Sequence, residues 1–156
     1  MQKARILNTR ETKQIMKKIE EQWGFRGDLR YTFIQNERDK IFVITNDLKL
    51  LEKPEDLRID SLGLYFGEFK NNELRLSIEG SQMIGPGATH DVIDLTRAQM
   101  IQWFKGDDIE MDIGGEPRYV IMRHEKDFLG TGRYKEGKIL NFVPKARRLD
   151  YKYAED

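Results

Sequence analysis

The spacing of apolar residues changes once along the chain, and this change limits the fold more than any other feature. Ile15, Ile19 and Trp23 recur every four positions, which predicts one amphipathic helix over residues 9–23. From residue 29 onward, apolar residues mostly alternate with polar ones, in short runs separated by Gly, Asn and Asp. This is the pattern of strands and turns. The chain is therefore expected to be α+β.

The predicted helix has recognisable signals at both ends. Asn8, followed three residues later by Glu11, is typical of an N-terminal capping box. Gly24 is placed to end the helix in a left-handed conformation. The face opposite the apolar stripe carries lysines and glutamates and is expected to be solvated.

Two hairpins are predicted in the first half of the chain. Their strands are residues 29–35 and 40–45 around a turn at 36–39, then 61–70 and 73–79 around Asn71 and Asn72. Leu74, Leu76 and Ile78 are expected to face one core from the last of these strands. Gly67 inside its strand indicates a bulge or a close approach of backbone. A short helical turn is expected after Asn46.

The sequence GPGATH at residues 85–90 is the best candidate for a domain boundary, because two glycines surround a proline. It lacks the Lys and Ser/Thr of a phosphate-binding loop. It divides the chain into predicted domains at residues 1–84 and 85–156. In the second, Thr96 is expected to cap a helix at 97–104, with Met100, Ile101 and Phe104 on its buried side. Five or six short strands surround that helix, which indicates a small barrel.

Composition excludes several kinds of chemistry. The chain has no cysteine, so disulfides, thiol catalysis and thiolate metal sites are excluded. His90 and His124 are the only histidines, and neither lies in a zinc-binding motif. We expect no metal, no cofactor and no catalytic residues, although paired carboxylates brought together by the fold would leave a small hydrolase open. With no membrane-length apolar run and no signal-peptide core, a cytoplasmic location is expected.

Charge is distributed unevenly along a chain whose formal net charge is zero. Residues 79–116 contain eight acidic and two basic residues, whereas residues 128–152 contain seven basic and two acidic ones. A neutral protein with one basic end is able to bind a polyanion locally. The alternative is a solvated, highly charged surface with no partner.

Three segments of the second half resemble a known family. FKGDDIEMD at residues 104–112, YVIM at 119–122 and FLGTGR at 128–133 are similar to the PUA domain, a small pseudo-barrel appended to RNA-modifying enzymes. The family's Gly-Asp turn is matched by Gly106 and Asp107, and its Gly-x-Gly strand by residues 130–132. NFVPKARRL at 141–149 resembles the end of the PUA-like domain of Fmu-type ribosomal RNA cytosine methyltransferases.

The resemblance extends upstream. Gly63, Phe66, Gly67 and Phe69 match a strand of the pre-PUA region in an archaeal and eukaryotic family that acts in large-subunit ribosome biogenesis. The resemblance implies a small N-terminal α+β pre-PUA domain followed by a C-terminal PUA-type β pseudo-barrel. Because the chain has no methyltransferase domain, the resemblance implies RNA binding without methyl transfer.

The predicted RNA-contacting residues lie near the end of the chain. Lysines and arginines would contact phosphate there, and Tyr134 offers a ring for base stacking. Phe142 offers a second ring for stacking, although its neighbours Leu140 and Val143 favour its interpretation as a core residue. The cations that follow Pro144 are expected to lie on a fixed segment. The predicted site residues are Arg133, Tyr134, Lys138, Asn141, Lys145, Arg147, Arg148 and Lys152.

The leading functional hypothesis is a non-catalytic RNA-binding protein for structured rRNA or tRNA, acting in ribosome biogenesis or RNA modification. The alternative is a protein-interaction adaptor for an RNA-modifying enzyme such as a methyltransferase, or for a ribosome assembly factor. No membrane partner is expected.

Overall fold

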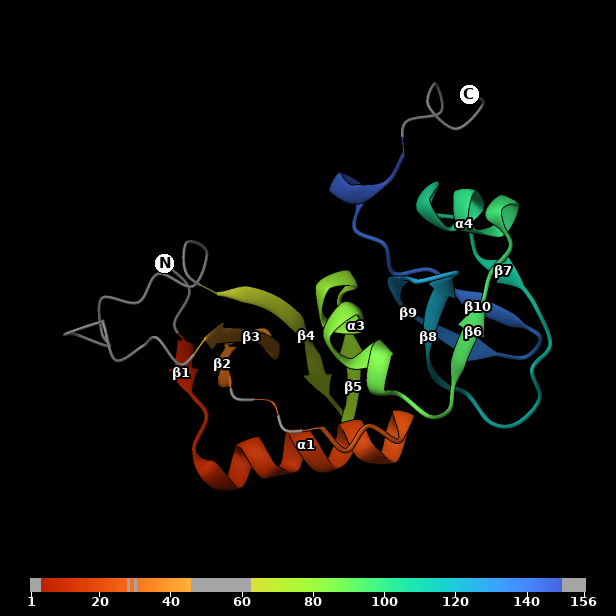
Figure 1. The fold of residues 1–156 in the computed structure, drawn as a ribbon. Coiled ribbons are helices and arrows are strands. Elements are labelled where there is room, and N and C mark those ends of the chain that lie inside the picture. The colour runs from red at the N-terminus through yellow and green to blue at the C-terminus, as the bar shows by residue number, and fades with distance from the viewer. Residues whose placement is uncertain (1–3, 28, 30, 46–62, 150–156) are drawn as a thin grey trace.

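Two five-stranded sheets form the protein in the computed structural model, which describes residues 4–27, 29, 31–45 and 63–149 (Figure 1). The first sheet is antiparallel, and its strands lie in sequence order. It consists of β1 (Ala4–Ile6), β2 (Tyr31–Asn36), β3 (Lys40–Thr45), β4 (Leu64–Lys70) and β5 (Glu73–Leu76). In Figure 1, α1 (Thr9–Trp23) runs along one side of this sheet.

The second sheet has the order β6-β8-β9-β10-β7 and is open, with β6 and β7 as its edges. Its strands are β6 (Val92–Asp94), β7 (Ile109–Glu110), β8 (Arg118–His124), β9 (Asp127–Lys135) and β10 (Lys138–Leu140). The β6–β8 pair is parallel and the other pairs are antiparallel. The expected strands thus form a half-barrel sheet, and the α+β class is confirmed.

Both predicted signals of α1 are present. The Asn8 side chain accepts a hydrogen bond from the Glu11 N–H at 2.9 Å, and Glu11 Oε1 accepts one from the Asn8 N–H at 3.2 Å. Gly24 has φ +73°, and a Cβ at this position would lie 1.8 Å from Thr89 Oγ1. Glycine is required there both by the left-handed backbone and by the close approach of the chain.

The two predicted hairpins are confirmed as β2–β3 and β4–β5. Asn71 and Asn72 have φ of 54° and 60°, the left-handed pair of a two-residue turn. The β3–β4 register shifts between Ile41 and Phe42, beside Gly67. A Cβ on Gly67 would lie 2.3 Å from the Arg75 carbonyl oxygen, so the predicted close approach is confirmed. The helical turn expected after Asn46 lies outside the described residues.

One predicted strand is wrong at its end. The chain leaves the sheet at Ser77, whose Oγ accepts a hydrogen bond from the Gly80 N–H at 2.9 Å and thereby caps α3 (Ile78–Ile84). Ile78 consequently packs with Leu95 and Trp103 in the second core, instead of joining Leu74 and Leu76 in the first. The alternation of Leu74, Leu76 and Ile78 predicts that the strand continues, but the Ser77 cap starts a helix there instead. Helix α3 runs directly into the 3-10 turn η3 (Gly85–Gly87).

Helix α4 (Arg97–Phe104) begins at the predicted cap, since Thr96 and Gln99 form a reciprocal capping box. Its buried side differs from the prediction. Trp103 is fully buried and donates its indole N–H to the Leu129 carbonyl oxygen at 2.9 Å. Met100, Ile101 and Phe104 are only partly buried. Among the described residues, no helix is long and apolar enough to cross a membrane.

Strand β8 joins the two halves of the molecule, because both of its faces are buried. Ile121 packs in the first core with Trp23 and Phe66, whereas Val120 and Met122 pack in the second core. A strand buried on both sides reads as a continuous apolar run, as YVIM does. The two sheets therefore share packing across β8, and the division at residues 84 and 85 stays a prediction.

Candidate nucleic-acid interface

The C-terminal segment, residues 141–149, is fixed to the second half of the molecule. The Asn141 side chain donates hydrogen bonds to the carbonyl oxygens of Trp103, at 2.7 Å, and Asp107, at 2.8 Å. The Asn141 N–H donates to Asp108 Oδ1 at 2.8 Å, and its side-chain oxygen accepts from the Val143 N–H. The Asn141 amide therefore holds the segment, which leaves it little hydrogen-bonding capacity for RNA.

The far end of this segment is also fixed, which confirms the expectation for the cations after Pro144. The Leu149 N–H donates to the Phe104 carbonyl oxygen at 2.7 Å, and Arg148 Nε donates to the Val143 carbonyl oxygen at 3.0 Å. Gly106, at φ +93°, gives Arg148 room, because a Cβ there would lie 2.7 Å from Arg148 Nε. The turn η4 (Lys145–Arg147) lies between these anchors.

Three of the predicted site residues present open cationic groups. Lys138, Lys145 and Arg148 are exposed, and none of them has an ion pair with a carboxylate in the described part of the chain. Arg147 is exposed too, but its Nη1 pairs with Glu79 Oε1. Lys152 lies outside the described residues.

Two other predicted site residues serve the scaffold in this structure. Arg133 Nη1 donates to Glu73 Oε2 at 2.7 Å, and this hydrogen bond raises the pKa of Arg133. Tyr134 is only 3% exposed, so its ring has no open face for a base. Its hydroxyl donates to Asp112 Oδ1 at 2.7 Å and thereby lowers the pKa of Asp112.

Phe142 lies at the surface, and its interpretation as a core residue is wrong. The side chain is 36% exposed. The Arg75 guanidinium lies 4.5 Å from the centroid of its ring, and Tyr119 meets the ring in an edge contact at 6.2 Å. Val143 takes the buried position next to it. Alternation along the segment turns Phe142 toward the first sheet and Val143 into the second core.

A cleft of about 290 Å³ lies between the two halves of the molecule. Its walls come from the first sheet, the start of α3 and the C-terminal segment. Sequence reasoning missed three of its residues, Lys40, Tyr65 and Arg75, because no local signal shows which strand residues face a cleft. Burial raises the pKa of the Tyr65 hydroxyl.

The two glycines of the Gly-x-Gly strand, Gly130 and Gly132, permit tight packing. A Cβ on Gly132 would lie 2.4 Å from Ile139 Cγ2 and 2.7 Å from Trp103 Cη2. The Gly130 N–H donates to the buried Ser81 Oγ at 2.8 Å. Both positions thus serve the close packing around β9.

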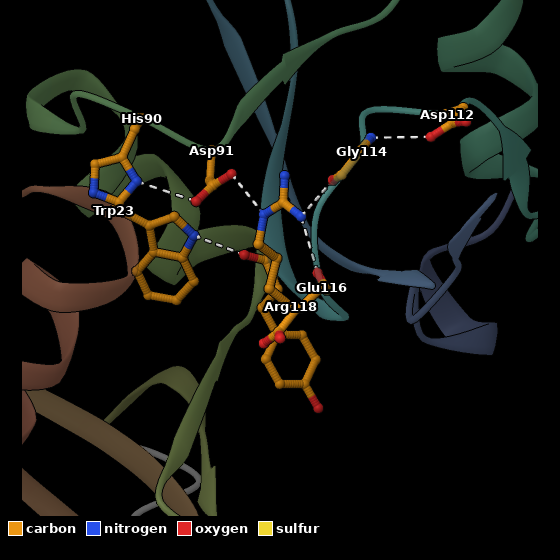
Figure 2. Close-up of polar contacts among 8 residues, drawn as sticks. Trp23, His90, Asp91, Asp112, Gly114, Glu116 and Arg118 are labelled. Carbon is orange, nitrogen blue, oxygen red and sulfur yellow. Dashed lines mark hydrogen bonds and ion pairs between the residues drawn. The ribbon is translucent and has the colours of Figure 1, made fainter. Parts of the chain in front are cut away.

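Asp91 serves as scaffold in a polar cluster next to a second contact between the halves, where the Trp23 indole N–H donates to the Tyr119 carbonyl oxygen at 3.2 Å (Figure 2). Arg118 Nε donates to Asp91 Oδ1 at 2.9 Å, and Arg118 Nη1 donates to the carbonyl oxygens of Gly114 and Glu116. His90 lies 3.1 Å from the other Asp91 oxygen. Across the described residues, no group of three or more His, Asp or Glu side chains is placed to hold a metal ion.

Comparisons with protein families define the class of the protein. Residues 90–149 match the PUA domain of the methyltransferase RsmF, and residues 4–78 match the pre-PUA domain of NIP7/UPF0113 proteins. A search of curated proteins found no match. The chain is a PUA-domain protein.

More particularly, it is a PUA-domain protein with an N-terminal pre-PUA domain of the NIP7 type, which confirms both resemblances. Domains of these two kinds are RNA-binding modules and not catalytic domains. They indicate RNA binding in ribosome biogenesis or RNA modification.

Proposed function

We propose that this protein is a non-catalytic RNA-binding protein for structured rRNA or tRNA, acting in ribosome biogenesis or RNA modification. The observation that carries the proposal is the anchored C-terminal segment with open cations. Lys145 and Arg148 lie on backbone that is tied to α4 and to the turn after it. A fixed cation loses less conformational entropy on binding than a cation on a mobile tail.

The chemistry of these groups suits an RNA backbone. Lys138 and Lys145 act as compact point charges, and the Arg148 guanidinium keeps donors for phosphate after its Nε has bonded the Val143 carbonyl oxygen. Folded RNA presents phosphates and 2′-hydroxyls on its surface, and proteins recognise it largely by shape. We therefore expect contact with the backbone of folded RNA, with little reading of bases at these three residues.

The test is a titration of the protein with a structured RNA hairpin at several salt concentrations. The variant carries Lys138→Ala, Lys145→Ala and Arg148→Ala. The matched control removes three exposed cations from α1, by Arg10→Ala, Lys13→Ala and Lys17→Ala. Each lost phosphate contact lowers the slope of log affinity against log salt by about 1. We expect a loss of about 2 to 3 in the C-terminal variant and little change in the control.

Two results would overturn the proposal. One is the absence of hairpin binding at low salt. The other is an equal loss of slope in both variants, since that would show non-specific attraction to any removed charge.

A second candidate is an adaptor that docks an RNA-modifying enzyme or a ribosome assembly factor. It is favoured by the outer edge of the first sheet, where β1 pairs with β2 alone among the described strands. Ile6 is 45% exposed on this edge strand, and open edges invite pairing with another chain. Co-purification of a partner that survives nuclease treatment, and is lost on Ile6→Lys substitution, would support it. We place either function in the cytoplasm.

A further inference from the structure

The cleft between the two halves of the molecule is built from both of them. The first sheet contributes Lys40, Tyr65 and Arg75, and the C-terminal segment contributes Phe142 and Arg147. In Figure 1, η4 is the blue turn near the C-terminus, and in this view it lies above α3. Such a cleft forms only when both halves are folded and packed together.

Aromatic rings and cations alternate along its lining. The Arg75 guanidinium lies 4.5 Å from the ring centroid of Phe142, and Lys40 Nζ lies 5.7 Å from that of Tyr65. The ring of Phe142 remains 36% exposed. Rings next to guanidinium planes are the surfaces on which proteins stack unpaired bases.

Cations outnumber acidic residues in the lining, and two of them pair with carboxylates, Arg75 with Glu68 and Arg147 with Glu79. Three cations, Lys40, Arg75 and Arg147, line the cleft together with one acidic residue, Glu79. Glu79 pairs with Arg147 through Nη1, which orients the guanidinium and leaves its other donors available. The lining thus combines apolar stacking surfaces with groups that bind an anion.

We propose that this cleft takes one unpaired nucleotide of the bound RNA, with its base against Phe142 and Tyr65 and its phosphate against Arg147 and Lys40. The volume of about 290 Å³ is at the lower limit of ligand pockets, which suits a single nucleotide and excludes a paired helix. The inference rests on the proposed function. It adds that the RNA carries a bulged or looped-out nucleotide at a set position relative to the C-terminal segment.

The experiment uses two hairpin RNAs that differ only in one bulged 2-aminopurine nucleotide. Affinity for each is measured with the full chain by fluorescence anisotropy, and stacking of the bulged base by quenching of its fluorescence. We expect the bulged hairpin to bind about 5- to 150-fold more tightly, the range for stacking one base. Phe142→Leu, which keeps an apolar side chain but removes the ring, should abolish most of this preference and the quenching.

Three further variants make the result specific. Lys145→Ala should weaken binding of both hairpins and leave their ratio unchanged. Tyr65→Leu provides a second test of the ring surface if Phe142→Leu lowers the thermal unfolding temperature, and Tyr65→Phe should preserve the preference.

Equal affinity of the parent chain for the two hairpins would overturn the inference and leave the proposed function in place. So would a preference that persists in both Phe142→Leu and Tyr65→Leu. Failure to bind either hairpin would overturn the proposed function, and this inference with it.

Discussion

The arginines at the junction of the two halves differ from two exposed lysines, Lys138 of β10 and Lys145 of the C-terminal segment. Arg75, Arg118 and Arg133 each pair with a carboxylate. Lys138 and Lys145 have no such partner among the described residues. The difference teaches that place in a basic stretch does not decide the role of a cation. The junction arginines are partly buried against their carboxylates, whereas Arg147 pairs with Glu79 and stays exposed with further donors.

The junction cations are also stacked on rings. The Arg133 guanidinium lies 4.8 Å from the ring centroid of Tyr119. The Tyr119 ring makes an edge contact with Phe142, and the Arg75 guanidinium lies over the Phe142 ring. A partly buried guanidinium needs such partners because desolvation disfavours an unpaired charge. The exposed lysines keep their hydration and are able to exchange it for phosphate.

The largest effect is expected on stability, from a substitution in the second core. Trp103→Ala removes a fully buried indole from the second core and should lower the free energy of unfolding by about 3–5 kcal/mol. Urea unfolding followed by circular dichroism measures this. Because β8 packs in both cores, the parent chain should unfold in a single transition. Two separate transitions in the parent would show that the halves are independent and that the junction contributes little.

A smaller effect on stability is expected from the hydrogen bonds that cross the junction of the two halves. The buried Thr131 hydroxyl donates to the Leu76 carbonyl oxygen at 2.9 Å, across from β9 to β5. Thr131→Val removes this donor while keeping the shape, and should destabilise the fold by about 1–3 kcal/mol. The control is Thr131→Ser, which keeps the hydroxyl and should retain the hydrogen bond. Equal stability of the Val variant and the parent would contradict a tie at this position.

Arg133→Met tests whether Arg133 belongs to the scaffold or to the RNA-binding surface. The ion pair with Glu73 has side chains 26% and 43% exposed, so solvent screens much of it. The loss of the pair and of the Tyr119 contact should lower stability by about 1 kcal/mol. The slope of RNA affinity against salt should stay at its parent value. A fall in this slope by about 1 would instead assign Arg133 to the RNA surface.

The smallest effect concerns pH. The Tyr134 hydroxyl, followed by the Gly114 N–H, lowers the pKa of Asp112 in the folded state. A carboxyl group with a lowered folded-state pKa contributes stability above its unfolded-state pKa, and this contribution is lost as the pH falls through the folded-state value. Asp112→Asn should therefore reduce the loss of stability as the pH falls below the ordinary pKa of an aspartate, and should leave the pH dependence near neutrality unchanged. An identical acid limb in variant and parent would contradict this linkage.

Local patterns predicted the local structure. Asn8, Gly24 and Thr96 were identified as caps because a cap depends on residues within one helical turn. The two hairpins followed from short apolar alternation around Asn-rich turns. Helix α3 was missed because it is only seven residues long and its apolar residues also fit a strand. A segment this short is recognised as a helix from its cap and its packing, because it is too short to show a helical repeat of apolar residues.

The candidate site was predicted only in part, because its geometry depends on pairs far apart in the sequence. Arg133 meets Glu73 across 60 positions and Asn141 meets Trp103 across 38. No local signal distinguishes Arg133 from Lys138 within one basic stretch. The concentration of basic residues placed the predicted site near the C-terminus, and the resemblance to the PUA family indicated RNA as its ligand. The anchoring of Asn141 and Leu149 shows how that segment is held.

The comparison is tested most directly by the salt dependence of RNA binding in two variants measured side by side, Lys138→Ala/Lys145→Ala/Arg148→Ala and Arg133→Met/Arg118→Met. The hairpin is titrated at four or more salt concentrations, and circular dichroism confirms that each variant is folded. We predict a slope lower by about 2 to 3 in the first variant and unchanged in the second. An unchanged slope in the first, or an equal loss in both, would contradict the assignment of the C-terminal segment as the RNA-binding surface.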